Sequence, residues 1–391
     1  MNRNLWLMVA AQALFMTNNI VFVAVNGLVG LSIAPFPWLA TLPIMGYVVG
    51  GAVSTGPVAW TQARWGRRVS FQIGLVVAFV SSLLAAWAVY TSNFWMLVAA
   101  TVVAGYYSAN GQLYRFAAAE LAKPNYRERA VSMVLAGGIV GGVLGPNLAK
   151  WAQHAGSVPF VGAYAALAVV ALIAMLIVAR VEFPPVPPKQ KGVATGRPLS
   201  EIMREPVFIV STAAAAFGYG VMNLLMAASP IAMKICGHPF SDAALVLEWH
   251  IIGMFAPGFF TGHLIKRFGP VAVMSAGVVL NLICIGIALQ GIEVANFVLS
   301  MFLVGVGWNF LFTAGTALSL NAYRPEEKDK AQGAINFCIF LMMMASSLSS
   351  GALVTTQGWR LLNHISLVPV ALTGVIVIWY VLRGSGRGAP A

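Results

Sequence analysis

Charged side chains are scarce in this chain: Asp, Glu, Lys and Arg make up 9% of its 391 residues, while hydrophobic residues make up 59%. Soluble globular domains carry about 25% charged residues, so this composition excludes an ordinary soluble fold. Many apolar runs are about 18 residues or longer, the length that a helix needs to cross a membrane. The sequence therefore predicts a protein that crosses a membrane many times.

Cysteines are few as well. Cys236, Cys284 and Cys338 lie in or beside apolar segments, at spacings that match neither a zinc site nor a disulfide framework. The chain also lacks a glycine-rich phosphate loop, a nucleophile elbow and a carboxylate dyad. We therefore predict that the protein is not an enzyme and holds no resident cofactor.

Acidic residues number 11 against 23 Lys and Arg, which gives a formal net charge of +12. The basic residues lie in short loops between apolar runs, so the charge predicts membrane lipid, and no nucleic acid, as a partner. Most of the basic loops fall on one side of the predicted spans, and the positive-inside rule assigns that side to the cytoplasm. We expect a multi-pass protein of the cell inner membrane with both termini in the cytoplasm.

Twelve apolar segments predict an all-α fold of twelve transmembrane helices. The N-terminal run is counted as the first of them, because it has no convincing cleavage site of a removed signal. The predicted spans are 5–30, 37–61, 69–90, 94–120, 129–152, 158–180, 206–233, 242–264, 271–290, 296–321, 331–355 and 360–383.

One long polar, Pro-rich stretch divides these spans into two sets of six. It covers 181–206 and is typical of a linker. We therefore predict an N-terminal six-helix half, 1–180, a cytoplasmic linker, and a C-terminal six-helix half, 207–391.

The two halves repeat each other in their loops. The second span is followed by GPVAWTQARWGRR (56–68), and the eighth by the similar GFFTGHLIKRFG (258–269). The fifth span is preceded by PNYRERAVS (124–132), and the eleventh by PEEKDKAQG (325–333). Both pairs are offset by roughly 200 residues, which indicates an internal duplication.

These loops resemble the major facilitator superfamily, whose loop signature is G-x-x-x-D-x-x-G-R-K/R. Gly66, Arg67 and Arg68 match it, but Ala63 stands where the family has Asp, and Lys266 occupies that place in the second copy. The resemblance implies two pseudo-symmetric six-helix halves and a transport function. The missing Asp puts in question the charge network that the family builds on it.

Two pairs of soft donors lie on the predicted seventh and eighth spans. Met222 and Met226 are four residues apart, as are His250 and Met254, so each pair lies on one face of its helix. Thioethers with an imidazole suit Cu(I), although Met also fills gaps in apolar bundles. An ionisable His at membrane depth favours a functional site. The sequence predicts a metal site made by these four residues.

The two motifs, MNLLM and HIIGM, are similar to those of the CcoA-like copper importers. That resemblance implies secondary active import of copper, as Cu(I), through Met222, Met226, His250 and Met254 by alternating access. Copper would then be a substrate that passes to a downstream acceptor for haem–copper oxidase assembly.

Transport of riboflavin or another small organic solute is the alternative. A sister branch of the same transporters is associated with riboflavin. Aromatic side chains would then line the path and stack on the solute, with Asn and Gln as hydrogen-bonding groups. The candidates are Trp249, Phe255, Trp308 and Phe310.

Four further positions have two interpretations each. Arg115 would bind an anion or move protons, or would pair with Gln112, Tyr114 or Glu120. Glu248 points away from His250 and would couple protons or pair with a base. Met233 and Cys236, with His238, would form an outer soft-metal site or an ordinary helix end.

Overall fold

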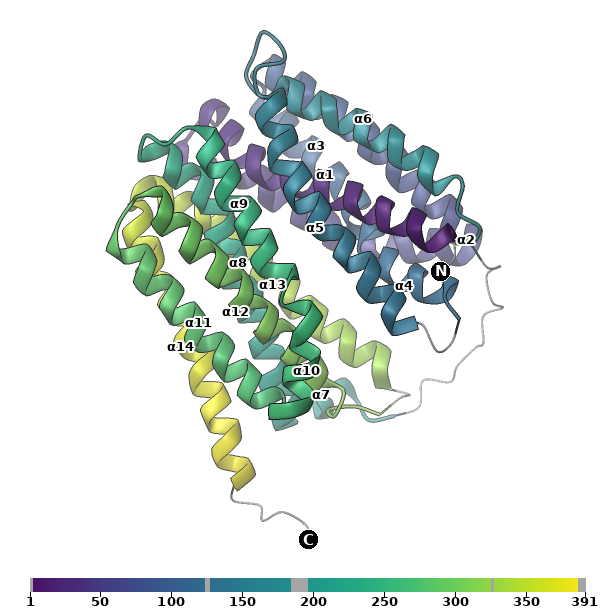
Figure 1. Ribbon diagram of the computed structural model, residues 1–391, viewed down its shortest axis with the longest axis vertical. Helices are drawn as coiled ribbons and strands as arrows, with labels where there is room; N and C mark the ends of the chain where they lie inside the picture. Colours follow the sequence, from purple (N-terminus) through teal and green to yellow (C-terminus); the bar gives the residue numbers. More distant parts are fainter. Residues whose placement is uncertain (1–2, 124–126, 184–195, 325–326, 386–391) are drawn as a thin grey trace.

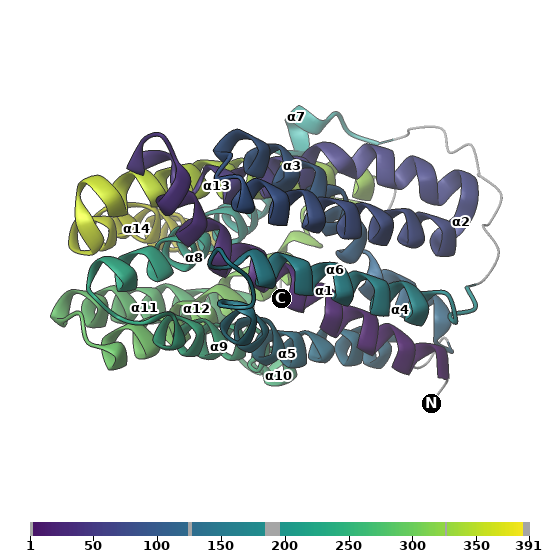
Figure 2. The ribbon, with the colours of Figure 1, turned by 90° about the horizontal axis from the view of Figure 1, so that it is seen from above.

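The computed structural model describes residues 3–123, 127–183, 196–324 and 327–385. Regular secondary structure within these residues is helical throughout (Figure 1). The purple-to-teal half and the green-to-yellow half lie next to each other in both ribbon views (Figures 1 and 2). The predicted all-α fold is confirmed.

Long apolar helices make up the first half, and a short 3-10 helix, η1, joins its first two. They are α1 (Arg3–Ile33), η1 (Pro37–Leu39), α2 (Leu42–Tyr90), α3 (Phe94–Gly111), α4 (Tyr114–Leu121), α5 (Arg127–Ala152) and α6 (Val161–Val178).

The second half follows a short helix, α7 (Leu199–Ile202). Its helices are α8 (Pro206–Ile235), α9 (Phe240–Phe255), α10 (Gly258–Phe268), α11 (Pro270–Gln290), α12 (Val294–Ser319), α13 (Lys328–Thr356) and α14 (Gly358–Ser385). Proline occupies the first turn of α8 and of α11, where its missing N–H costs no hydrogen bond.

Ten helical segments of the described chain are long and apolar enough to cross a membrane. They account for the twelve predicted spans because α2 contains two of them, joined at a kink at Gly66, and because the fourth span is divided into α3 and α4. The eighth span is also divided, at Pro257, between α9 and α10. A proline disrupts helix hydrogen bonds, which explains the second division.

Two glycines show the duplication in the backbone itself. Gly66 bends α2 with φ 81° and ψ 173°, and Gly269 separates α10 from α11 with φ 82° and ψ 157°. Only glycine adopts this conformation without strain. The two repeated loops therefore make the same turn roughly 200 residues apart.

The loop around the Gly66 turn keeps an ion pair, although Ala63 stands where the loop signature of the family has Asp. Arg67 donates to both carboxylate oxygens of Glu120, at 2.9 and 2.5 Å, and to the amide oxygen of Gln62 at 2.7 Å. Glu120 comes from α4, so α4 supplies the acid and the charge of Arg67 stays balanced.

The halves touch through α1 with α8, α2 with α13, and α5 with α9. We call the end of the bundle where α6 ends and α8 begins the linker end, and the other end the far end. At the far end, Asn147 of α5 donates a hydrogen bond to Glu248 of α9. At a separate interface, the Gly351 N–H of α13 donates to Oγ1 of Thr41, which precedes α2, at 3.0 Å. The far end is thus closed by contacts between the halves.

The predicted linker falls largely on 184–195, which lie outside the described residues, so the proposed domain boundaries stay predictions. Its last residues are held to the second half. Arg197 donates to Glu327 at 3.1 and 3.0 Å and to Glu205 at 2.9 Å. The Arg197 guanidinium lowers the pKa of Glu327 to about 2, helped by the backbone N–H of Arg324.

Candidate functional site

The four predicted copper ligands lie on α8 and α9, and all are buried. Met222 and Met226 are 3% and 7% exposed, Met254 is 6% exposed, and His250 is fully buried. Burial of the thioethers fits either a ligand role or core packing, because Met does both.

The His250 ring has a defined orientation. Its Nδ1 lies 2.7 Å from the carbonyl oxygen of Met301 on α12. A carbonyl only accepts, so Nδ1 carries the proton and Nε2 presents a lone pair. Nε2 is buried and has no hydrogen-bond partner in the part of the chain that the structure describes. His250 therefore has the neutral tautomer that a metal ligand needs.

Helix α12 packs against both α8 and α9. His250 faces it from α9, and Gly305 of α12 makes the contact close, because a Cβ there would lie 2.6 Å from the His250 carbonyl oxygen. Gly218 of α8 faces Leu311 of α12, and Met222 lies one turn further along that face. The metal site itself stays a prediction.

The prediction that Glu248 and His250 serve different sites agrees with their contacts. Glu248 accepts a hydrogen bond from Asn147 of α5, whereas His250 donates to α12. At the far end of α8, burial raises the pKa of the Cys236 thiol and disfavours its thiolate, the form that binds metal.

A cluster of aromatic rings lies between α8 and α12, near the middle of both helices. The Tyr219 ring meets Trp308 edge to face at 5.2 Å and Phe312 at 5.5 Å. Trp308 and Phe312, one turn apart on α12, stack at 5.2 Å with an angle of 10°. Phe255 adds a fourth ring at 6.4 Å from Trp308. We call these four residues the aromatic cluster.

The aromatic cluster borders the first half of the molecule. A Cβ at Gly138 of α5 would lie 3.9 Å from the Phe255 ring. On α4 of that half, the guanidinium carbon of Arg115 lies 4.9 Å from the centre of the Phe116 ring. No carboxylate of the described chain pairs with Arg115, because Glu120, one predicted partner, binds Arg67.

Two buried donors of the described chain are left without acceptors, and one of them, the Trp308 indole, contacts Tyr219. The Nε of Arg115 and the indole Nε1 of Trp308 are buried, with no hydrogen-bond partner among the described residues. Both groups can only donate. Rings that stack, together with the indole donor of Trp308, suit a flat heteroaromatic molecule that carries a carbonyl group.

Sequence reasoning found part of this cluster. Of the four predicted aromatic residues, Phe255 and Trp308 belong to it; Trp249 is 44% exposed and contacts Phe302 instead, at 6.1 Å. Phe310 is partly buried in the core. Tyr219 and Phe312 were missed. Tyr219 lies three residues before Met222, and Phe312 lies four after Trp308, so helical spacing was the signal available.

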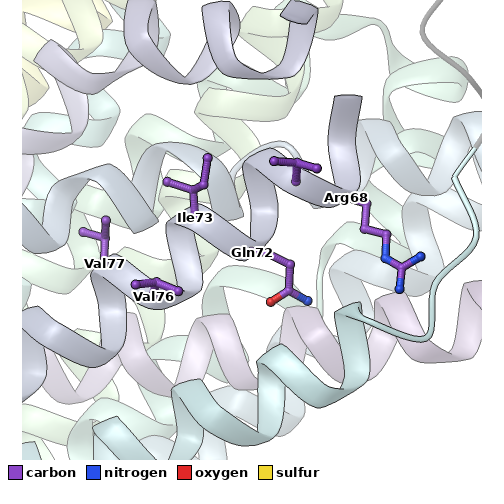
Figure 3. A pocket seen from close by; sticks show the side chains of 6 residues that line it. Arg68, Gln72, Ile73, Val76 and Val77 are labelled. Carbon is purple, nitrogen blue, oxygen red and sulfur yellow. The ribbon is translucent and has the colours of Figure 1, made fainter. Parts of the chain in front are cut away.

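A recess on the surface of α2 is a different feature. Arg68, Val69, Gln72, Ile73, Val76 and Val77 line it (Figure 3). Arg68 and Gln72 donate to backbone carbonyls at the end of α6, Ala179 at 2.5 Å and Met175 at 2.9 Å. The recess contains none of the predicted site residues.

Among curated proteins, the riboflavin transporter RfnT of Brucella anthropi is 36% identical over 393 aligned positions, covering 100% of this chain and 98% of the relative. The uncharacterised transporter YddS of Bacillus subtilis is 25% identical and covers 88% of this chain and 83% of its own.

Among solved structures, a nucleoside transporter, NupG, superposes with a TM-score of 0.76 at 12% identity, covering 97% of this chain and 99% of its own. A D-xylose–proton symporter gives 0.75 at 15% identity, with 96% of each chain covered. These likenesses show the fold.

The profile of the Major Facilitator Superfamily matches residues 5–256 and 213–390, which together span nearly the whole chain. The profile, the full-length relative and the paired six-helix halves agree. This chain belongs to the Major Facilitator Superfamily and is a multi-pass secondary transporter, not an enzyme.

Proposed function

We propose that this transporter carries riboflavin or a closely related flavin across the membrane by alternating access. The single observation that carries the proposal is the aromatic cluster, whose Trp308 indole N–H has no acceptor among the described residues. The relative that transports riboflavin aligns over the full length of the chain and supports the same substrate class.

The chemistry of a flavin fits this cluster. Its three fused rings are flat, and stacked or edge-to-face rings at about 4.5–7 Å contribute roughly 0.5–1.5 kcal/mol per pair beyond area burial. Tyr219 and Trp308 also carry polar groups at their rims, so one wall of the site stacks while its edge forms hydrogen bonds. Backbone and side-chain packing on α12 hold Trp308 and Phe312 parallel.

Riboflavin uptake by cells that cannot synthesise it tests the proposal. The wild-type chain should restore growth at low riboflavin concentration. Trp308→Ala should reduce uptake by about tenfold, because base-like rings lose roughly 1–3 kcal/mol of stacking on such a truncation. Trp249→Ala is the matched control, since that ring is exposed and lies outside the cluster. Absence of riboflavin uptake by the wild-type protein would refute the proposal.

For the orientation, we propose the cell inner membrane with both termini and the linker end in the cytoplasm, from the distribution of Lys and Arg. The contacts that close the far end would then seal the outer face in the present state. Fusions of a reporter that is active only in the periplasm should be inactive at either terminus.

Copper import is the second candidate, and the free Nε2 of His250 favours it. With Met222, Met226 and Met254 it would bind Cu(I) as a substrate, which a downstream copper acceptor would receive. Uptake of labelled copper and uptake of riboflavin, each measured with and without a Cu(I) chelator, separate the two candidates. A flavin carrier takes up riboflavin equally in both conditions.

A further inference from the structure

The recess on α2 is basic at one end and apolar along the rest of its length. Figure 3 shows Arg68 at one end and Val77 at the other. Valine and isoleucine side chains line the part between them, with spacings that keep them on one side of the helix: Val69, Ile73, Val76 and Val77. The lining runs about 14 Å along the helix axis. A molecule that fits it has a polar head and an apolar tail.

The recess lies on the side of the first half that points away from the second half. It borders α6, which packs against α1, α2 and α5, all of them helices of the first half. Figure 1 shows α6 along that outer edge of the molecule. Val69 and Val76 are 44% and 46% exposed. Apolar side chains exposed on the outer edge of a membrane-spanning bundle contact lipid.

Two exposed tryptophans mark the depth of the basic end. The rings of Trp60 and Trp65 meet edge to face at 5.1 Å, and the side chains are 57% and 48% exposed. Exposed tryptophan is typical of the boundary between membrane and water. Arg68 follows Trp65 after the turn at Gly66, so it lies at the level of the lipid headgroups. The apolar lining continues from there into the membrane.

Three arginines gather at this end of the recess. Arg68 donates to the Ala179 carbonyl at 2.5 Å, and Arg3 of α1 donates to the carbonyl of Arg180, the third of them, at 3.5 Å. Capping the end of α6 in this way uses one N–H of each side chain, and a guanidinium has five. Glu182 is the acid nearest to them in sequence, but in the described chain it pairs with none of the three. The basic end therefore has both charge and donors to offer.

The duplication shows that the shared fold does not require this arginine. Gly269 makes the same turn as Gly66, and the residue two positions after it is Val271, where the first half has Arg68. Ser275 likewise stands in the place of Gln72. The basic end of the recess is thus a property of the first half alone.

We propose that the recess binds an anionic phospholipid, whose phosphate contacts Arg68 and Arg3 and whose acyl chain lies along Val69, Ile73 and Val76. Guanidinium groups pair strongly with phosphate, and basic pockets between transmembrane helices bind anionic headgroups. The volume of the recess, about 370 Å³, is small for a ligand site, so it holds one chain of the lipid. The bound lipid joins α1, α2 and α6 at the linker end, whatever solute the transporter carries.

A matched pair of lipids tests this proposal. Phosphatidylglycerol and phosphatidylcholine with identical acyl chains differ in net charge. Their dissociation constants are measured by native mass spectrometry on the purified full-length protein in detergent. The wild-type protein should bind phosphatidylglycerol about 5-fold or more tightly than phosphatidylcholine. Arg68→Gln and Arg3→Gln should each weaken phosphatidylglycerol about 5-fold, the size of one basic contact to an anionic lipid, and change phosphatidylcholine less than about 2-fold.

Arg267→Gln is the matched control, because Arg267 is exposed beside the equivalent turn of the second half. It should leave both dissociation constants unchanged. Val76→Trp fills the apolar part of the recess and should weaken both lipids alike. Glycerol phosphate, the headgroup without its chains, should not displace the lipid at equal concentration.

Four results would overturn the proposal. They are equal affinity of the wild-type protein for both lipids, a preference that survives in Arg68→Gln and Arg3→Gln, an equal loss in Arg267→Gln, and full displacement by glycerol phosphate. Unchanged binding of both lipids by Val76→Trp would place the lipid elsewhere and count equally against it. Size-exclusion profiles establish that each variant is folded, and Arg3→Gln keeps the test decisive if Arg68→Gln does not fold, since Arg3 is exposed at the start of α1.

Discussion

His250 and Trp308 each bury one ring nitrogen that has no partner among the described residues, but the two nitrogens require opposite partners. His250 Nδ1 gives its proton to the Met301 carbonyl, so its Nε2 offers a lone pair. The Trp308 nitrogen offers a proton. A soft metal fits the first and a carbonyl fits the second, and these two residues therefore carry the choice between copper and flavin.

The methionine pair tests that choice directly. Met222→Leu with Met226→Leu keeps volume and hydrophobicity, and such changes usually cost less than about 1.5 kcal/mol of stability. We expect normal membrane abundance and riboflavin uptake within about 2-fold of wild type, since these swaps leave the stacking rings in place. Uptake of both solutes is measured in the same cells. Loss of copper uptake with unchanged abundance would instead support the thioether site.

The ion pair of Glu327 makes stability depend on pH. Because Arg197 lowers the pKa of Glu327 from 4.5 to about 2, the folded state is stabilised above the unfolded pKa, and this contribution is lost as the pH falls from 4.5 toward 2. Glu327→Gln should therefore be less stable than wild type near neutral pH, and the difference should shrink on acidification. Thermal unfolding of the purified protein between pH 7 and pH 3 measures this.

Glu201→Gln is a suitable control for that series, because Glu201 lies on α7 and is exposed. A difference between Glu327→Gln and wild type that stays constant across this pH range would mean that the ion pair does not stabilise the fold.

At the scale of helices, the contact between α9 and α12 sets the position of both candidate sites. A Cβ at Gly305 would lie 2.6 Å from the His250 carbonyl oxygen and 2.9 Å from the Met254 nitrogen, both of them backbone atoms that cannot move separately. Gly305→Ala should force the helices apart and cost about 1–3 kcal/mol, as overpacking generally does.

Gly286 of α11 provides the comparison, because a Cβ there would meet nothing within 4 Å. Gly286→Ala should be neutral or slightly stabilising, since alanine favours the helix by about 0.4–1 kcal/mol. Melting temperatures of the two variants in the same detergent decide the matter. Equal melting temperatures would show that α9 and α12 tolerate a wider separation.

At the scale of the whole molecule, the far end is closed where Phe160 and Phe240 meet with ring centres 5.2 Å apart. Phe160 is the N-cap of α6 in the first half, and Phe240 begins α9 in the second. In a background without Cys236, Cys284 and Cys338, cysteines at both positions joined by a short cleavable thiol reagent should stop transport. Cleavage of the crosslink between the two cysteines should restore transport, because the halves must separate there in each cycle.

Phe240→Cys alone, treated with the same reagent, controls for simple modification. Transport that continues at the wild-type rate with the halves joined would contradict a cycle in which the far end opens.

Much of this architecture was predictable from local pattern. Apolar runs located the helices, and the repeated loops indicated the duplication that Gly66 and Gly269 display. The linker and the boundaries of the halves stay predictions. The replacement of the family Asp by Ala63 was visible as well. The sequence did not show that Glu120 balances the charge of Arg67 instead. These two residues are distant in sequence and meet only when α4 packs beside the bend in α2.

The sequence by itself determined the membrane-spanning, all-α, duplicated chain, because hydropathy and helical period are properties of neighbouring residues. It also placed two soft pairs on consecutive spans. Only the tertiary structure decided that Tyr219, Trp308 and Phe312 form one cluster, and that His250 turns toward α12. The reason is physical: which face of a helix meets which neighbour depends on close packing between segments that are distant in the sequence, and no local pattern encodes that choice.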